Sequence, residues 1–252
     1  KRMRWGDRDD EFVRPVHWAV LLFGDEVIPA TILGVQTDRF THGHRFHSPQ
    51  PIRLTAPADY ARQLAEQGKV IADFSERRDV VRAQAEAAAA ELGGVAVIQP
   101  ELLDEVTALV EWPVALAGNF ERRFLAVPAE ALISTMQDHQ RYFPVVDAHG
   151  QLLPHFITMT NLVSRDPAQV RAGNERVIRP RFSDAEFFWN QDRKQPLAAR
   201  MEMLKQVVFQ QRLGSVAEKS IRVAALARFI AEQSHGNAEW AERAARLAKC
   251  DL

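Results

Sequence analysis

Residues 142–160 read YFPVVDAHGQLLPHFITMT, two apolar runs on either side of a short polar segment that contains a glycine. Branched and aromatic side chains favour strands, and a short Gly-containing segment between two such runs is typical of a hairpin. We therefore predict antiparallel strands over 142–146 and 152–160, joined across Ala148, His149 and Gly150. The centre of the chain is thus expected to contain an antiparallel sheet.

Strand and helix patterns alternate on the N-terminal side of this hairpin. Gly24-Asp25 separates two β-rich runs, 16–23 and 27–35, and predicts an antiparallel pair at the start of the chain. Two further short strands are expected, at 114–117 and 124–127. Helical spacing, proline starts and glycine stops predict helices over 59–92, 100–112 and 128–139. Residues 1–165 are therefore predicted to form an α+β domain of mixed antiparallel sheet and helices.

The strand pattern stops after residue 165. Residues 197–213 are apolar at helical spacing and end at Gly214, and Ser215 with Glu218 predicts a capping box for a helix to about Gln233. We therefore predict a second, helical domain over 166–252. Pro180 and Pro196 are alternative boundaries, because each also marks a change of composition.

The charges are nearly balanced, with 32 Lys and Arg against 33 Asp and Glu, so any nucleic-acid binding would need a local basic face. No apolar run approaches the ~20 residues that a membrane span requires. The single cysteine, Cys250, excludes an internal disulfide framework and a cysteine-based zinc site. A reducing compartment, the cytoplasm, is the expected location.

Arg176, Arg179 and Arg181 surround Pro180, which we expect to stop a helix, within RAGNERVIRPRFSDAEFFWNQDR (residues 171–193). Guanidinium groups bind phosphate bidentately, and the aromatic residues that follow could cover unpaired bases. This pattern is typical of an RNA contact. The competing interpretation, which is the commoner role of such a run, is an interdomain brace in which the arginines pair with Asp184 and Glu186 and the aromatic residues lie in a core.

Residues 39–57 form a second basic segment, with three arginines, three histidines and no carboxylate. Its Gly, Pro and Ser content predicts a loop, and Arg45 beside His44 indicates an RNA or inter-domain contact. A purely structural loop is the alternative. Zinc bound by His42, His44 and His47 is less favoured, because no cysteine or carboxylate in the loop supplies a fourth ligand.

Several long blocks, in the same order, carry a family resemblance across nearly the whole chain. They are FTHGHRFHSP (40–49), LVEWPVALAGNFERRFLAVPAEALISTMQDHQRYFPV (109–145), TNLVSRDPAQVRAGNERVIRPRFSDAEFFWNQDR (160–193), VVFQQRLGS (207–215) and LAKCDL (247–252). Together they closely resemble the β subunit of the bacterial heterotetrameric glycyl-tRNA synthetase.

The resemblance implies a central part of a longer chain with no cofactor and no catalytic residue of its own. In that family the α subunit uses glycine, ATP and Mg to make glycyl-adenylate, and the β subunit supplies most tRNA binding. The implied partners are the α subunit, tRNA(Gly) and a second β subunit. The implied fold is similar to the editing-type domain of the phenylalanyl-tRNA synthetase β subunit, followed by the first helices of a domain resembling HD phosphohydrolases.

The sequence does not support a second, hydrolytic activity. An HD enzyme needs a His-Asp pair among its metal ligands, whereas Asp138-His139 stands in the reverse order. An editing hydrolase is also disfavoured, because glycine is the smallest amino acid and larger ones can be excluded sterically. We expect a noncatalytic tRNA-binding and assembly segment, with Arg45, Arg176, Arg179 and Arg181 on phosphates and His44 or Phe46 near a base or ribose. A purely structural module that contacts no RNA is the alternative.

Overall fold

The protein, described by a computed structural model over residues 2–252, has a mixed α and β architecture. It divides into two compact units, of which the first ends at Ser183 and the second spans Asp184–Leu252. Helix α5 (Pro167–Asp192) contributes to both units. A domain boundary after residue 165 stays a prediction.

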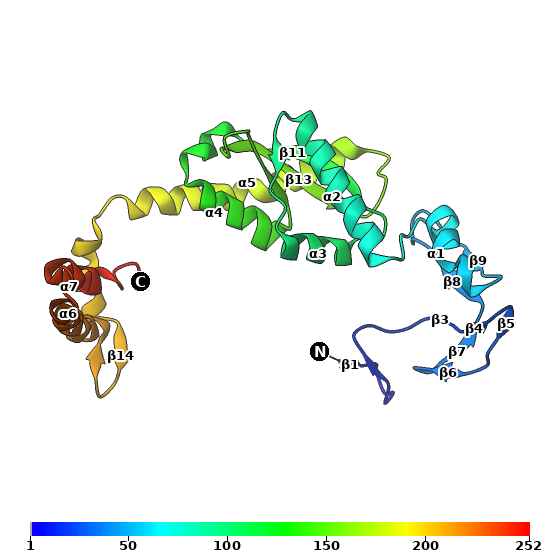
Figure 1. The fold of residues 1–252 in the computed structure, drawn as a ribbon, viewed down its shortest axis with the longest axis horizontal. Coiled ribbons are helices and arrows are strands. Elements are labelled where there is room, and N and C mark those ends of the chain that lie inside the picture. The colour runs from blue at the N-terminus through cyan, green and yellow to red at the C-terminus, as the bar shows by residue number, and fades with distance from the viewer. Residues whose placement is uncertain (1) are drawn as a thin grey trace. The chain divides into compact units, whose positions relative to one another are not determined.

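The first unit is built on a four-stranded antiparallel sheet with the order β10-β12-β13-β11 (Figure 1). The predicted hairpin is confirmed: β12 (Phe143–Val146) pairs with β13 (Leu152–Thr160), and Gly150 has the positive φ of 78° that the turn requires. β11 (Val114–Asn119) pairs along the other edge of β13, and β10 (Val95–Ala96) pairs with β12. The antiparallel α+β class predicted for this part of the chain is therefore confirmed.

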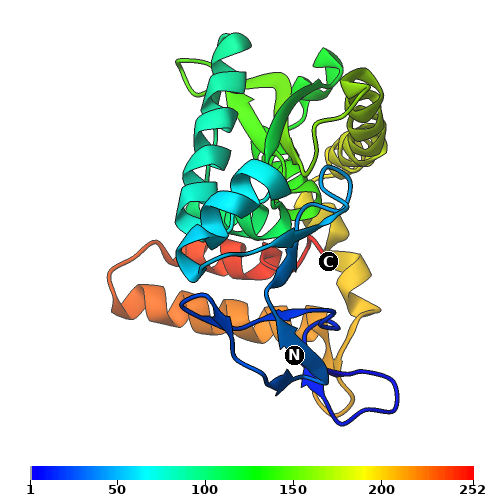
Figure 2. The ribbon, with the colours of Figure 1, turned by 90° about the vertical axis from the view of Figure 1, so that its right-hand side faces the viewer.

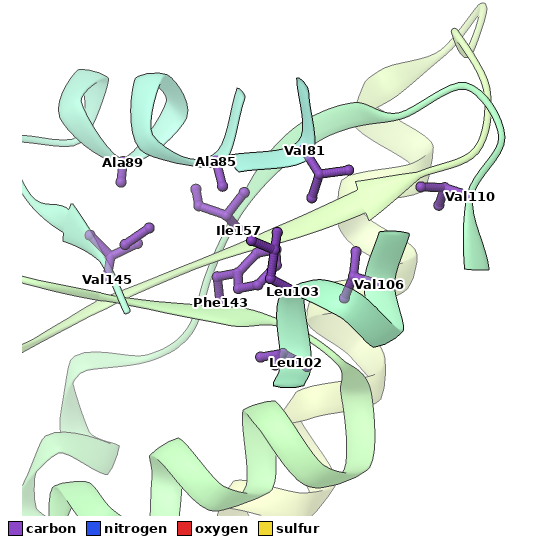
Figure 3. Close-up of a cluster of buried hydrophobic side chains, with 11 residues drawn as sticks. Val81, Ala85, Ala89, Leu102, Leu103, Val106, Val110, Phe143, Val145 and Ile157 are labelled. Carbon is purple, nitrogen blue, oxygen red and sulfur yellow. The ribbon is translucent and has the colours of Figure 1, made fainter. Parts of the chain in front are cut away.

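Helices α2 (Phe74–Glu91) and α3 (Pro100–Leu109) pack on one face of this sheet. The Asp73 carboxylate caps α2 by accepting from the Glu76 N–H at 2.8 Å, and the helix stops before Gly93, as predicted. Ala85 and Ala89 of α2 point toward the strands, so the small side chains allow a close approach (Figure 3). The buried cluster comprises Val81, Ala85, Ala89, Ala96, Leu102, Leu103, Val106, Val110, Phe143, Val145 and Ile157.

Helix α5 lies on the side of the sheet away from α2, as Figure 2 shows. The segment between β11 and β12 forms η3 (Arg122–Ala126), α4 (Ala129–Ser134) and the π-helical η4 (Thr135–His139). The strand predicted over 124–127 is wrong, because this apolar segment is a 3-10 turn. Its Phe124 is fully buried against Phe182 of α5, so burial is achieved without strand pairing.

Short strands make up the N-terminal part of the first unit. The predicted hairpin at Gly24-Asp25 is confirmed, since β4 and β5 pair antiparallel around it, whereas β3 and β7 pair in parallel. The strands are β1 (Met3–Arg4), β2 (Glu11–Phe12), β3 (Ala19–Val20), β4 (Leu22–Phe23), β5 (Glu26–Val27), β6 (Thr31–Ile32), β7 (Val35–Asp38), β8 (Phe40–His42) and β9 (Pro51–Arg53).

The helix predicted over 59–92 is interrupted. Before α2 it forms η1 (Pro57–Asp59), α1 (Tyr60–Gln63) and the π-helical η2 (Leu64–Gly68). Lys69 then takes a left-handed φ of 54°, which ends this first helical segment.

The second unit is helical except for one small hairpin. The capping box at Ser215 and Glu218 is confirmed, and it starts α6 (Val216–Gln233), which is followed by α7 (Ala238–Leu247). The helix predicted over 197–213 is wrong in its second half. A 3-10 helix, η5 (Leu197–Lys205), leads into β14 (Val208–Gln210), which pairs with β15 (Gly214–Ser215), so the segment after residue 165 is not all helical. Gly214, expected to stop a helix, instead provides the hairpin with a φ of 87°.

Leu204, Val216 and the buried Cys250 form the core of the second unit. Within residues 2–252 no helix is long and apolar enough to cross a membrane.

Candidate nucleic-acid interface

Pro180 lies inside α5, so the prediction that it stops the helix is wrong. A proline in a helix interior removes one backbone hydrogen bond and costs about 3 kcal/mol. Packing on both sides compensates for this cost. Ile178 and Phe182 are fully buried, and Phe182 meets Phe120 edge-on with ring centroids 4.9 Å apart. The segment predicted to be a basic turn is therefore part of a continuous helix.

Polar contacts fix the inner face of α5 to the sheet. The Arg171 guanidinium donates to the Ala117 carbonyl of β11 at 2.9 Å, and the Glu175 carboxylate accepts from the backbone N–H of Asn119 at 2.9 Å. These anchors recur at the helical spacing of Ile178 and Phe182, and that spacing in the sequence could have indicated a continuous helix. The opposite face of α5 is left at the surface.

Arg176, Arg179 and Arg181 are all exposed, but their surroundings differ. Arg179 pairs with Glu121 at 2.5 Å, a partner far upstream of the Asp184 and Glu186 considered from the sequence. Arg181 donates to the Val177 carbonyl of its own helix at 2.8 Å. Among residues 2–252, the Arg176 side chain has no hydrogen-bond or ion-pair partner.

The ion pair with Arg179 also affects the pKa of the Glu121 carboxyl. Burial alone would raise its pKa, but a hydrogen bond from its own backbone N–H, together with the hydrogen bond and charge of Arg179, lowers the pKa below its usual value. The ionised carboxylate therefore holds Arg179 over the start of η3.

Helix geometry does not gather all three arginines on one line. At ~100° per residue, Arg176 and Arg179 lie about 60° apart around the axis, whereas Arg181 lies about 140° from Arg176. The basic surface of α5 is therefore broad, with Arg176 and Arg181 on either side of Pro180. Phe187 and Phe188, two of the aromatic residues that follow these arginines, are exposed and belong to the second unit.

His44 lies in the loop between β8 and β9 and is only 2% exposed. Its backbone N–H donates to the Gly68 carbonyl at 2.7 Å, and its Nδ1 accepts from the N–H groups of Phe46 and His47 at 3.3 and 3.4 Å. The side chain is thus occupied in holding the loop in shape.

Arg45 and Phe46 are presented by this loop. The Arg45 guanidinium lies 5.7 Å from the centre of the Phe46 ring, and Phe46 is 71% exposed. A cation beside an exposed aromatic ring can contact both a phosphate and a base. Arg45 belongs to the loop between β8 and β9, whereas the other three arginines belong to α5, so the two candidate surfaces are built on different elements of the first unit.

The other two loop histidines have different neighbours. The His42 ring lies 4.5 Å from the Trp18 ring, and His47 Nε2 accepts from the Val163 N–H at 3.0 Å. In the part of the chain that the structure describes, no group of three or more His, Cys, Asp or Glu side chains is placed to hold a metal ion.

Comparison with known proteins identifies the class as a subunit of an aminoacyl-tRNA synthetase. The family described as "Glycyl-tRNA synthetase beta subunit" matches residues 1–252, and the chain belongs to this family.

Relatives agree with this assignment over the full length of the chain. It is 58% identical over 252 residues to the glycine–tRNA ligase beta subunit of Hahella chejuensis, 58% identical over 253 residues to that of Marinobacter nauticus, and 54% identical over 252 residues to that of Pseudomonas aeruginosa. Each match covers 100% of this chain but only 36%, 36% and 37% of the relative. The chain therefore spans just over a third of the length of these relatives.

Proposed function

We propose that this chain is a noncatalytic segment of a glycine–tRNA ligase, in which it contributes tRNA binding and subunit assembly. Family membership supports the enzyme class. The observation that carries the RNA contact is the exposed surface of α5, where Arg176 has no side-chain partner among residues 2–252 and Arg181 bonds only to its own helix. Guanidinium groups held on a rigid element are suited to phosphate contacts.

The loop of Arg45 supplies a second phosphate contact in this proposal. Its exposed Phe46 is available to stack on an unpaired base, and the buried His44 supports the loop from beneath. His44 would therefore act on RNA through loop geometry, with Arg45 as the group that touches it.

The chemistry would take place on a partner α subunit, which would bind glycine, ATP and Mg. The remaining partners would be tRNA(Gly) and a second copy of the β subunit, in the cytoplasm. The antiparallel sheet between α2 and α5 is compatible with a relationship to the editing-type domain of the phenylalanyl-tRNA synthetase β subunit. The helices of the second unit would begin a domain resembling HD phosphohydrolases.

The test uses the full-length β subunit assembled with its α subunit. Replacing both Arg176 and Arg181 with alanine should weaken tRNA(Gly) binding by about tenfold at moderate salt, because two phosphate contacts are lost. Arg243→Ala is the matched control, since Arg243 is an exposed arginine on α7 outside the proposed surface. Unchanged affinity in the double variant, or an equal loss in the control, would refute the RNA contact.

The ion pair between Arg179 and Glu121 favours a second function, a structural module that contacts no RNA. On that alternative, Arg179→Ala and Glu121→Ala would lower the melting temperature alike. The double variant at Arg176 and Arg181 would then leave tRNA affinity unchanged. Melting and binding measured on the same variants separate the two functions.

A further inference from the structure

His155 of β13 lies opposite Asn119, the last residue of β11. The ring nitrogen Nδ1 of His155 lies 2.7 Å from the side-chain oxygen Oδ1 of Asn119. The Glu175 carboxylate of α5 accepts from the backbone N–H of Asn119 at 2.9 Å and from its side-chain Nδ2 at 3.4 Å. A chain of hydrogen bonds therefore runs from α5 through β11 to the His155 ring.

This chain determines which nitrogen of the imidazole carries the proton. A carboxylate can only accept, so the amide nitrogen of Asn119 faces Glu175 and the amide oxygen faces His155. An amide oxygen also only accepts, so Nδ1 is the protonated nitrogen of His155. In the neutral ring, Nε2 is therefore an acceptor.

Nε2 of His155 is open to a ligand. No hydrogen bond within residues 2–252 reaches this atom, the residue is partly exposed, and Nε2 is not one of the polar atoms sealed from solvent. Burial, and after it the charge of Arg122, lower the pKa of His155 below its usual value. The ring is therefore neutral at neutral pH and presents a fixed acceptor.

Arg122 of η3 supplies a cation beside this acceptor. Its side chain is exposed and has no hydrogen-bond or ion-pair partner among the residues that the structure describes. Its charge is near enough to act on the His155 ring. Glu121, the preceding residue, pairs instead with Arg179 of α5. Arg122 is therefore free to bind an anion, next to the basic surface of α5.

A neutral acceptor beside a cation fits a ligand that carries a hydroxyl next to an anionic group. A nucleotide of RNA has this arrangement, because its 2′-hydroxyl lies on the carbon next to the one that bears the 3′-phosphate, whereas DNA lacks the hydroxyl. Guanidinium groups bind phosphate, and an unprotonated imidazole nitrogen accepts from a hydroxyl. A metal ion does not fit, since over residues 2–252 no three His, Cys, Asp or Glu side chains are placed to hold one.

We propose that His155 and Arg122 form a ribose-phosphate site, in which a 2′-hydroxyl donates to His155 Nε2 and the adjacent phosphate contacts Arg122. Asn119 and Glu175 are positioning residues, because they hold the ring without touching the ligand. The ribose belongs either to an RNA strand or to a free ribonucleotide. The first source rests on the proposed tRNA binding, whereas binding of a free nucleotide does not.

The direct test titrates the full-length β subunit with adenosine 3′-phosphate and with its 2′-deoxy counterpart, followed by NMR of the His155 ring nitrogens. We expect an unprotonated Nε2 at neutral pH, whose resonance shifts saturably with the ribonucleotide. The deoxynucleotide should bind about fivefold more weakly, because it lacks one neutral hydrogen bond. A protonated Nε2, an absent shift, or equal binding of the two nucleotides would overturn the proposal.

Variants separate the two contacts of the site. His155→Ala should bind both nucleotides equally, whereas Arg122→Ala should weaken both by about tenfold and keep the preference for ribose. His149→Ala is the matched control, since His149 is an exposed histidine in the turn between β12 and β13. A ribose preference that survives in His155→Ala, or that is lost in His149→Ala, would contradict the assignment.

The tRNA(Gly) affinity of the assembled enzyme identifies the source of the ribose. A loss of about fivefold in His155→Ala assigns the site to tRNA. Unchanged tRNA affinity, with nucleotide binding to the wild type intact, assigns it to a free ribonucleotide. Both outcomes support the ribose-phosphate site. The second counts against an RNA contact at His155 only, because the double variant at Arg176 and Arg181 tests the surface of α5 separately.

Discussion

Gly118 of β11 has no room for a side chain. A Cβ at this position would lie 2.3 Å from the Phe156 ring, which is fully buried and stacks on Tyr142 with centroids 4.5 Å apart. Because the ring is held on both sides, we predict that Gly118→Ala lowers the free energy of unfolding by about 1–3 kcal/mol through overpacking. Urea denaturation of the full-length subunit would measure this change.

Gly173 of α5 is the matched control, since its Cβ would have no heavy atom within 4 Å. Gly173→Ala should instead stabilise the subunit by about 0.5–1 kcal/mol, because alanine restricts the unfolded chain and favours the helix. If both variants were equally destabilised, the steric explanation for Gly118 would be wrong.

Because Tyr142 is buried, the stability of the first unit should fall at alkaline pH. Burial raises the pKa of its phenol to about 12, and the nearby charge of Arg181 opposes this only in part. The unfolded phenol ionises near pH 10, so the contribution is complete below pH 10 and is lost as the pH rises through about 12. The two-unit shift corresponds to about 2–3 kcal/mol.

Tyr142→Phe tests this contribution. The variant should lose about 1 kcal/mol at neutral pH, because the phenol no longer donates to Asn174 at 2.7 Å. Between pH 10 and pH 12, however, its unfolding free energy should fall less than that of the wild type. Parallel decline of the two proteins over this range would contradict the assignment.

At the scale of elements, α5 keeps a proline in its interior because Ile178 and Phe182 are buried on either side of it. We predict that Pro180→Ala stabilises the subunit by about 1–3 kcal/mol, since the helix regains a backbone hydrogen bond at an exposed position. Melting and hydrogen exchange of the α5 amides would measure the effect. Pro100→Ala, at the first residue of α3, should change stability by less than about 0.5 kcal/mol.

Elements specified by local chemistry could be predicted from the sequence. The hairpin β12–β13 depends on its turn residues, and α6 begins at a capping box that is complete within four residues. The turn at Phe124 and the proline within α5 could not be predicted, because both depend on contacts between segments far apart in the chain. Tertiary burial overrides local propensity at these positions.

In the candidate site too, the sequence identifies the residue types, whereas contacts between distant segments determine their surroundings. The sequence identifies Arg45, Arg176, Arg179 and Arg181 as basic residues near aromatic ones, but it does not reveal their partners. Arg179 pairs with Glu121, which lies 58 positions away, and the ring of His44 is buried beneath its own loop.

At the scale of the whole molecule, the net charge of -1 means that RNA binding must depend on local groups. Each phosphate contact contributes about 0.7–0.9 to the slope of log K against log salt concentration. Arg176 and Arg181 have no acidic partner among the described residues, whereas Arg179 is neutralised by Glu121. Arg176 and Arg181 should therefore together contribute about 1.5 to the slope in the assembled enzyme, and Arg179 should add little.

This prediction is tested by measuring tRNA(Gly) affinity over a range of salt concentrations. Replacing Arg176 and Arg181 with alanine should reduce the slope by about 1.5, and adding Arg179→Ala should reduce it little further. Arg179→Ala combined with Glu121→Gln should behave like Arg179→Ala alone if the ion pair faces away from RNA. A third full decrement on removing Arg179 would instead mean that RNA displaces Glu121, because only an arginine released from its carboxylate can neutralise a phosphate.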